Sequence, residues 1–162
     1  MKSFTLATKD ILSLVQYLEA VEARDLEETK ICTKTLHDLE DSVRAFLAKR
    51  GQLQTEFSTK YSATKAGFSE EYRAALNIPE EGERHTRLTN LQERYTLETQ
   101  AVERAYFDKI EALNEDAEKE AKAETSDEKF TYLFDKLKEN GAGFWKEKKT
   151  FIHIMETLDA IK

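Results

Sequence analysis

The stretch LHDLEDSVRAFLAKRGQLQTEF, from Leu36 to Phe57, decides which class of fold the chain adopts. Apolar side chains and one long aliphatic stem recur there in steps of three and four, at Leu36, Leu39, Val43, Phe46, Arg50, Leu53 and Phe57. This spacing is typical of a heptad seam, which runs along one face of an α-helix and packs against another helix. The seam therefore needs a partner, in this chain, in a second copy or in another protein.

Two long helices are predicted around this seam. The first covers about residues 26–66 and the second about residues 83–123, with a connection at 67–82 that contains Gly67, Pro79 and Gly82. The second helix has an eleven-residue repeat of apolar positions, at Leu91, Tyr95, Val102, Tyr106 and Leu113. Antiparallel packing within the chain would bury both stripes. Because seven and eleven are different periods, we expect the register to drift and some surface to stay free for other partners.

Shorter elements flank the long helices. The N-terminal MKSFTLA predicts a short strand or extended arm, and C-terminal helices are predicted within residues 126–162. The run TFIHI, Thr150 to Ile154, favours a helix; the alternative is a strand paired with the N-terminal arm. The acidic end of the second long helix is expected to project into solvent. The fold prediction is all-α, an elongated helical bundle of one domain over 1–162, with a minor terminal strand pair as an option.

The composition restricts the function classes. Charged residues make up 35% of the 162 residues, above the roughly 25% of an average soluble protein. The net charge of −7 argues against a nucleic-acid binder, which usually carries a basic face. No apolar run approaches the ~20 residues of a membrane span, and the N-terminus lacks a secretory signal. We expect a cytoplasmic protein that binds neither nucleic acid nor membranes.

Motifs that carry chemistry are absent. None of the three histidines follows a glutamate by three residues, as a di-iron bundle requires. No phosphate-binding loop and no nucleophile elbow occurs. Cys32 and His37 are five residues apart on one helix and so do not face each other. The sequence therefore predicts no enzyme, with no catalytic, cofactor-binding or metal residues and no cofactor.

Four residues are candidates for binding a partner: Arg50, Phe57, Tyr61 and Trp145. Arg50 either extends its head to water or, buried in the seam, fixes register or partner. Trp145, in GFWKEKK, is either a core tryptophan beside a basic solvent face or an aromatic residue that stacks on nucleic-acid bases or binds a membrane surface. The acidic run between Glu111 and Glu124 is either a solvated helix face or a site of metal binding or DNA mimicry.

The first sixty residues resemble a group of small bacteriophage-encoded helical proteins of uncharacterised function. The resemblance rests on a short arm of the MK-x-x-TL type and on a long charged helix, LEDSVRAFLAKRGQLQTEF. It implies a viral origin, and it carries no site residues to this chain.

The function expected from these observations is a non-enzymatic protein-interaction or assembly module. It would bind a partner protein or a second copy of itself through its helix faces. The alternative is an acidic inhibitor that mimics nucleic acid and blocks a DNA-binding enzyme. The two differ in charge layout, because an inhibitor needs its acids concentrated on one face, whereas lysines and arginines are interleaved in most segments here.

Overall fold

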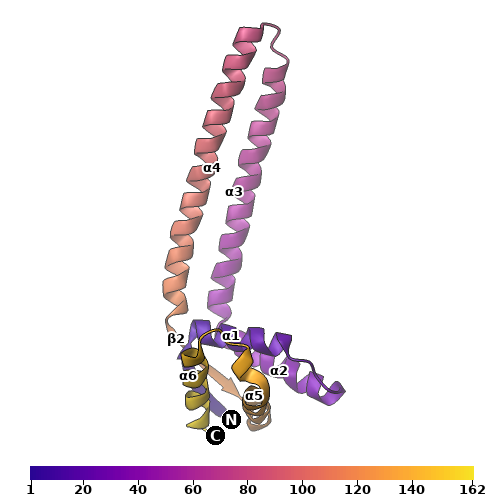
Figure 1. Ribbon diagram of the computed structural model, residues 1–162, viewed down its shortest axis with the longest axis vertical. Helices are drawn as coiled ribbons and strands as arrows, with labels where there is room; N and C mark the ends of the chain where they lie inside the picture. The colour runs from indigo at the N-terminus through magenta and orange to yellow at the C-terminus, as the bar shows by residue number, and fades with distance from the viewer. The chain divides into compact units, whose positions relative to one another are not determined.

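The computed structural model describes all residues from 1 to 162, and its elements are labelled in Figure 1. In chain order they are β1 (Lys2–Ala7), α1 (Thr8–Ala20), α2 (Leu26–Ser42), α3 (Arg44–Leu76), α4 (Glu81–Ala117), β2 (Glu120–Thr125), α5 (Asp127–Asn140), the 3₁₀ helix η1 (Gly141–Gly143) and α6 (Lys148–Asp159). The chain is 80% helical. The predicted all-α fold with two long packed helices and a minor strand pair is confirmed.

The chain divides into two compact units. The terminal unit combines the two ends of the chain, Met1–Ala48 and Asn114–Lys162, and the hairpin unit is the middle, Lys49–Leu113. The ends pack on each other and the middle packs on itself. The single helical domain expected over residues 1–162 stays a prediction, and the two units are described one at a time below.

The terminal unit holds most of the buried side chains. α1, α5 and α6 each contribute an apolar stripe. The least exposed residues of these three helices are Ile11, Leu14, Leu18, Leu133, Leu137, Ile154 and Leu158. α6 contains the TFIHI run, so the favoured helical prediction for it is confirmed. Ser126 caps α5 by accepting a hydrogen bond from the backbone N–H of Lys129.

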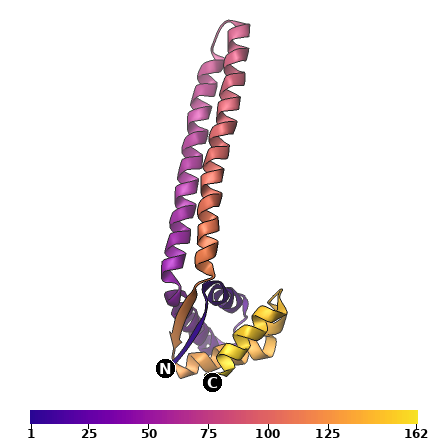
Figure 2. The same cartoon turned by 90° about the vertical axis from the view of Figure 1, so that its left-hand side faces the viewer.

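A two-stranded antiparallel sheet joins the two ends of the chain. β1 pairs with β2 so that Phe4 lies opposite Ala123 and Leu6 opposite Ala121. The prediction that residues up to 123 continue the second long helix into solvent is therefore wrong. Small side chains on β2 leave room for the large ones on β1, and β2 also contacts α2. Figures 1 and 2 show the two strands side by side.

The first long helix is interrupted at Val43, which separates α2 from α3 with φ −120° and ψ 19°. A single helix over residues 26–66 was predicted, and this is wrong. Leu39 and Val43 are buried in the core of the terminal unit, whereas Leu53 is buried in the hairpin unit. The seam thus serves two different partners, and the helix breaks between them although the sequence has no glycine or proline at this point.

α3 and α4 form the hairpin and lie side by side along their length in both views (Figures 1 and 2). The connection is only residues 77–80, much shorter than the predicted 67–82, because α3 continues through Gly67 to Leu76. The Glu80 carboxylate begins α4 by accepting a hydrogen bond of 2.8 Å from the Gly82 backbone. The Arg84 side chain donates to the Ile78 carbonyl at 3.2 Å and braces the link.

Candidate interaction surface on the helical hairpin

The two hairpin helices share one period. The side chains of α3 that face α4 step by four and seven, at Leu53, Phe57, Thr64, Phe68 and Ala75, as those of α4 do. The expected conflict between a heptad and an eleven-residue repeat is therefore wrong, because the heptad ends at Phe57. Phe57 stacks on Tyr106 with ring centroids 4.3 Å apart, and Phe68 stacks on Tyr95 at the same distance. The helices thus stay in register between these layers.

This register reflects a repeat in the sequence that the heptad interpretation missed. The motif Phe-Ser-x-x-Tyr occurs twice in α3, from Phe57 to Tyr61 and again from Phe68 to Tyr72, eleven residues later. In both copies the tyrosine packs beside the phenylalanine, with centroids 5.8 Å and 5.6 Å apart. An eleven-residue comparison of the chain with itself would have found it.

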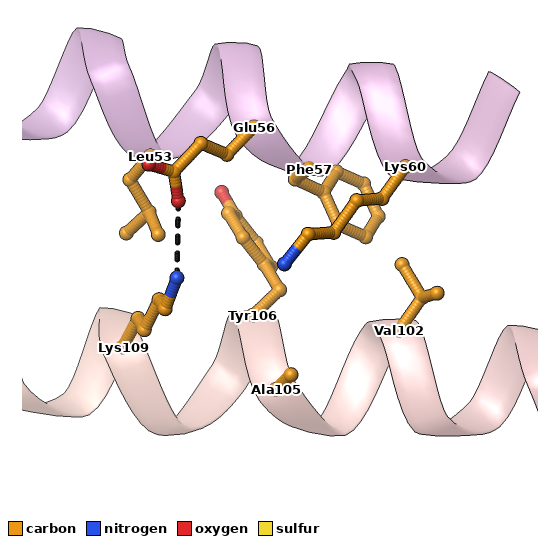
Figure 3. Close-up of a pocket in the computed structure, with 8 residues that line it drawn as sticks. All are labelled: Leu53, Glu56, Phe57, Lys60, Val102, Ala105, Tyr106 and Lys109. Carbon is orange, nitrogen blue, oxygen red and sulfur yellow. Dashed lines mark hydrogen bonds and ion pairs between the residues drawn. The ribbon is translucent and has the colours of Figure 1, made fainter. Parts of the chain in front are cut away.

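One side of the hairpin, here named the charged flank, carries ion pairs. Figure 3 shows Lys109 of α4 reaching Glu56 of α3 beside Phe57 and Tyr106, with an Nζ–Oε2 distance of 3.0 Å. The hydrogen bond from Lys109 lowers the pKa of the Glu56 carboxyl below its usual value. The cavity beneath has a volume of about 20 Å³, close to the space of one water molecule.

The next repeat on the charged flank is built differently. Gly67 stands one repeat after Glu56, and the cavity there has a volume of about 110 Å³. Glu71 accepts a hydrogen bond from Arg94 across this cavity, and that bond lowers the pKa of the Glu71 carboxyl. Arg94 also pairs with Glu98 at 3.6 Å. The acids of this flank are therefore neutralised within the hairpin.

The opposite side, here named the aromatic flank, is almost free of charge. At about 100° per residue, the positions that turn to this side follow from the shared seam. From α3 they are Gln54, Ser58, Tyr61, Lys65, Ser69 and Tyr72. From α4 they are Gln92, Thr96, Thr99, Glu103, Phe107 and Ile110. One lysine and one glutamate are the only charged side chains among these twelve, in a chain that is 35% charged. Arg50, eleven residues before Tyr61, continues the same side toward the start of α3.

The aromatic flank leaves large rings in solvent. Phe107 is 64% exposed, Tyr61 37% and Tyr72 38%. Phe107 packs against Tyr106 with centroids 6.0 Å apart, so the exposed rings continue the stack in the seam. The Thr99 hydroxyl is buried here without a hydrogen-bond partner.

The hairpin unit has a narrow core of its own. The buried side chains of residues 49–113 are Leu53, Ala75, Leu91 and Leu113. Two helices can bury only the line along which they touch, and helices this polar gain little stability from propensity. More apolar surface lies on the hairpin than two helices can cover.

The four candidate residues lie in different places. Phe57 and Tyr61 are adjacent in the hairpin, at the edge of the aromatic flank. Arg50 is exposed on α3, so this seam position is not buried. Trp145 belongs to the terminal unit, where its ring lies 5.4 Å from Tyr17 and 5.3 Å from Phe151. The sequence prediction did not include Tyr72 and Phe107.

Other kinds of site find little support. No three His, Cys, Asp or Glu side chains gather as metal ligands would. None of the helices combines the length and the apolarity needed to cross a bilayer. Comparisons with protein-family models, with curated proteins and with solved structures find no match to this chain.

Proposed function

We propose that this protein acts by binding, as a non-enzymatic interaction or assembly module, and that the aromatic flank of the α3–α4 hairpin is its binding surface. The carrying observation is the contrast between the two sides of the hairpin. The charged flank satisfies its acids internally, whereas the aromatic flank exposes Tyr61, Tyr72 and Phe107 with few charges around them. Exposed aromatic rings with few neighbouring charges are typical of the centre of protein–protein interfaces.

The alternative, an acidic inhibitor that mimics nucleic acid, receives less support. Such a protein needs unpaired carboxylates in a row on one surface. On the hairpin, Glu56 and Glu71 are paired with Lys109 and Arg94. In the acidic run, Asp116 in the last turn of α4 pairs with Lys119, and Glu124 on β2 pairs with Lys122. The viral origin and the cytoplasmic location expected from the sequence stay predictions.

The test compares two exposed apolar side chains on α4. Phe107 lies on the aromatic flank, and Leu97, 66% exposed, lies on the side of α4 that faces away from α3. We expect Phe107→Glu to abolish binding and Leu97→Glu to leave it intact, because only the first places a charge in the interface. Binding is measured as proteins retained from an extract of the native source, together with the protein's own mass by light scattering.

Circular dichroism serves as the control that both variants keep their helices. If both variants bind and assemble like the wild-type protein, the aromatic flank is not the binding surface. If both lose binding while folded, the surface is not confined to this flank. Either result would reject the proposal.

A further inference from the structure

The two charges on the aromatic flank have no partners within the chain. Lys65 of α3 and Glu103 of α4 are both exposed, and neither takes part in an ion pair or hydrogen bond. Four other acids of the hairpin and its link, Glu56, Glu71, Glu80 and Glu98, do bond to neighbours. Lys65 and Glu103 are the only charged residues among the twelve that define the flank, and both are unpaired. Whatever covers the flank is therefore expected to offer them complementary charges.

The hairpin register gives the levels of these residues along the axis. Here "up" means toward the link between α3 and α4. Because Phe57 is level with Tyr106, and Phe68 with Tyr95, each residue further up α3 is level with the residue one position earlier in α4. By this count Glu103 lies about five residues, roughly 7 Å, below Lys65 along the hairpin. Phe107 lies the same five residues below Tyr61. Both flank pairs thus have the same offset.

We infer that a second copy of this chain covers the aromatic flank, with the two hairpins parallel and related by a two-fold axis along their length. The inference rests on the proposed function of this flank. In this arrangement α3 of each copy lies beside α4 of the other, which makes a four-helix bundle with antiparallel neighbours. Lys65 meets Glu103 of the second copy, and Tyr61 meets Phe107 of the second copy.

The direction of the side chains supports this pairing. A helical side chain leans toward the N-terminus of its own helix. On α3 the N-terminus lies away from the link, so its side chains lean down the hairpin. On α4 the N-terminus lies at the link, so its side chains lean up. Lys65 and Glu103 of the second copy therefore lean toward each other across their 7 Å offset. The same holds for Tyr61 and Phe107 of the second copy, and two-fold symmetry repeats each contact.

The antiparallel arrangement of two copies fits less well. It would place α3 against α3 and α4 against α4. The α3 part of the flank offers no acid to Lys65, and the α4 part offers no lysine or arginine to Glu103. Both charges would then be covered without partners, which is unfavourable. The parallel pair satisfies both charges with the residues this chain already carries, and this is why a second copy is favoured over a foreign protein.

Charge reversal on the whole chain tests the inference. We expect the wild-type protein to become dimeric as its concentration rises, in sedimentation or light scattering. Lys65→Glu and Glu103→Lys should each weaken the dimer by about tenfold or more, because each places like charges together. The double variant should restore it, since the pair is only exchanged. Arg104→Glu and Glu93→Lys, on the face of α4 away from α3, are the matched controls and should not change the mass.

Two results would overturn the inference. A wild-type protein that stays monomeric at all concentrations excludes the second copy. A dimer that survives each single reversal, or that the double variant fails to restore, excludes this pairing.

A cross-linking experiment separates failure of the inference from failure of the proposed function. Phe107 is replaced by a photoreactive phenylalanine analogue, Phe107→p-benzoylphenylalanine, in a mixture of ¹⁴N- and ¹⁵N-labelled chains. A mixed-isotope product joined near Tyr61 supports the two-fold pair. Products only with other proteins of a native extract reject the second copy but keep the flank as a binding surface. Absence of any product rejects both.

Discussion

Tyr17 shows how one residue holds α1 to the C-terminal part of the terminal unit. Its side chain is 3% exposed, and its hydroxyl donates a hydrogen bond of 2.7 Å to the Lys136 carbonyl. The side chain of Asn140 meets the same hydroxyl oxygen. Burial raises the pKa of Tyr17 from 10.0 to about 12, and the charge of Glu139 adds to this. The folded chain therefore keeps a proton on Tyr17 that the unfolded chain has lost above pH 10.

We expect Tyr17→Phe to lower the free energy of unfolding at pH 8 by about 1–2 kcal/mol, because a buried hydrogen bond is lost. The raised pKa adds a pH dependence. The stabilisation from the hydroxyl is full below the unfolded value of 10.0 and is lost as the pH rises through about 12. Urea unfolding at pH 8 and at increasing alkaline pH should show the two proteins converging. A gap that widens with pH would contradict the prediction.

Glu28 on α2 gives the opposite pH dependence. It pairs with the buried Lys136 of α5, and it accepts a hydrogen bond of 2.6 Å from the Arg24 backbone. The hydrogen bond from Lys136 lowers the pKa of the Glu28 carboxyl, with the Arg24 bond the next cause. A lowered pKa gives stabilisation that is present above the unfolded value and lost as the pH falls through the folded one.

We therefore expect Glu28→Gln to flatten the fall of stability in mild acid, measured as melting temperature against pH below 4.5, the ordinary pKa of a glutamate. Glu27→Gln is the matched control, since Glu27 is 79% exposed and pairs only with the surface residue Lys30. If Glu28→Gln shows the same dependence of melting temperature on pH as the wild-type protein, the ion pair does not contribute to the loss of stability in acid.

At the scale of the helix, glycines differ by what surrounds them. Gly67 lies inside α3, and a Cβ there would meet nothing within 4 Å. Gly141, at the end of α5, is crowded, because a Cβ would lie 2.9 Å from a ring carbon of Phe151 and 3.2 Å from Leu137. Neither glycine has a positive φ. The neighbouring atoms therefore decide whether the protein tolerates a methyl group at each position.

We expect Gly67→Ala to stabilise the protein by about 0.5–1 kcal/mol, because alanine loses less backbone entropy in a helix. Gly141→Ala should destabilise it by about 1 kcal/mol or more, since the ring of Phe151 must move. Thermal unfolding of both variants beside the wild-type protein measures the two changes. Shifts of the melting temperature in the same direction would refute the steric explanation.

The elements that the sequence predicted well are those with local signals. The period of apolar residues located α4, and the C-terminal helices predicted within residues 126–162 are α5 and α6. β2 was missed because EAKAET has no β-branched residue before Thr125, and only pairing with the distant β1 makes it a strand. The break at Val43 was missed for the same reason, since it arises from two different packing partners.

The candidate surface could be predicted only in part. Phe57 and Tyr61 were found because they lie on or next to the seam. Phe107 falls outside the apolar stripe of α4, so its place on the same side of the hairpin as Tyr61 follows only from the three-dimensional register. The charge-poor flank likewise can be identified only when both helices are known to share one period.

At the scale of the whole molecule, the two units differ in how much they bury. The terminal unit has most of the fully buried side chains, and the hairpin unit has four buried ones. We expect native-state hydrogen exchange to be slowest in α1 and α5, and faster in the hairpin of dilute protein. Hairpin protection should rise with protein concentration if a second copy covers the aromatic flank. Uniform protection at all concentrations would contradict this expectation.

The pairing of β1 with β2 has a consequence for synthesis on the ribosome. Ala7 pairs with Glu120, so the strand made first must wait for one that is made more than a hundred residues later. At about 5–20 residues per second, the delay is roughly 6–20 s. The hairpin closes through contacts much nearer in sequence, and it is complete while β1 still lacks its neighbour. During this interval the apolar residues of the nascent N-terminus are open to chaperones, and the last third of the chain ends their exposure.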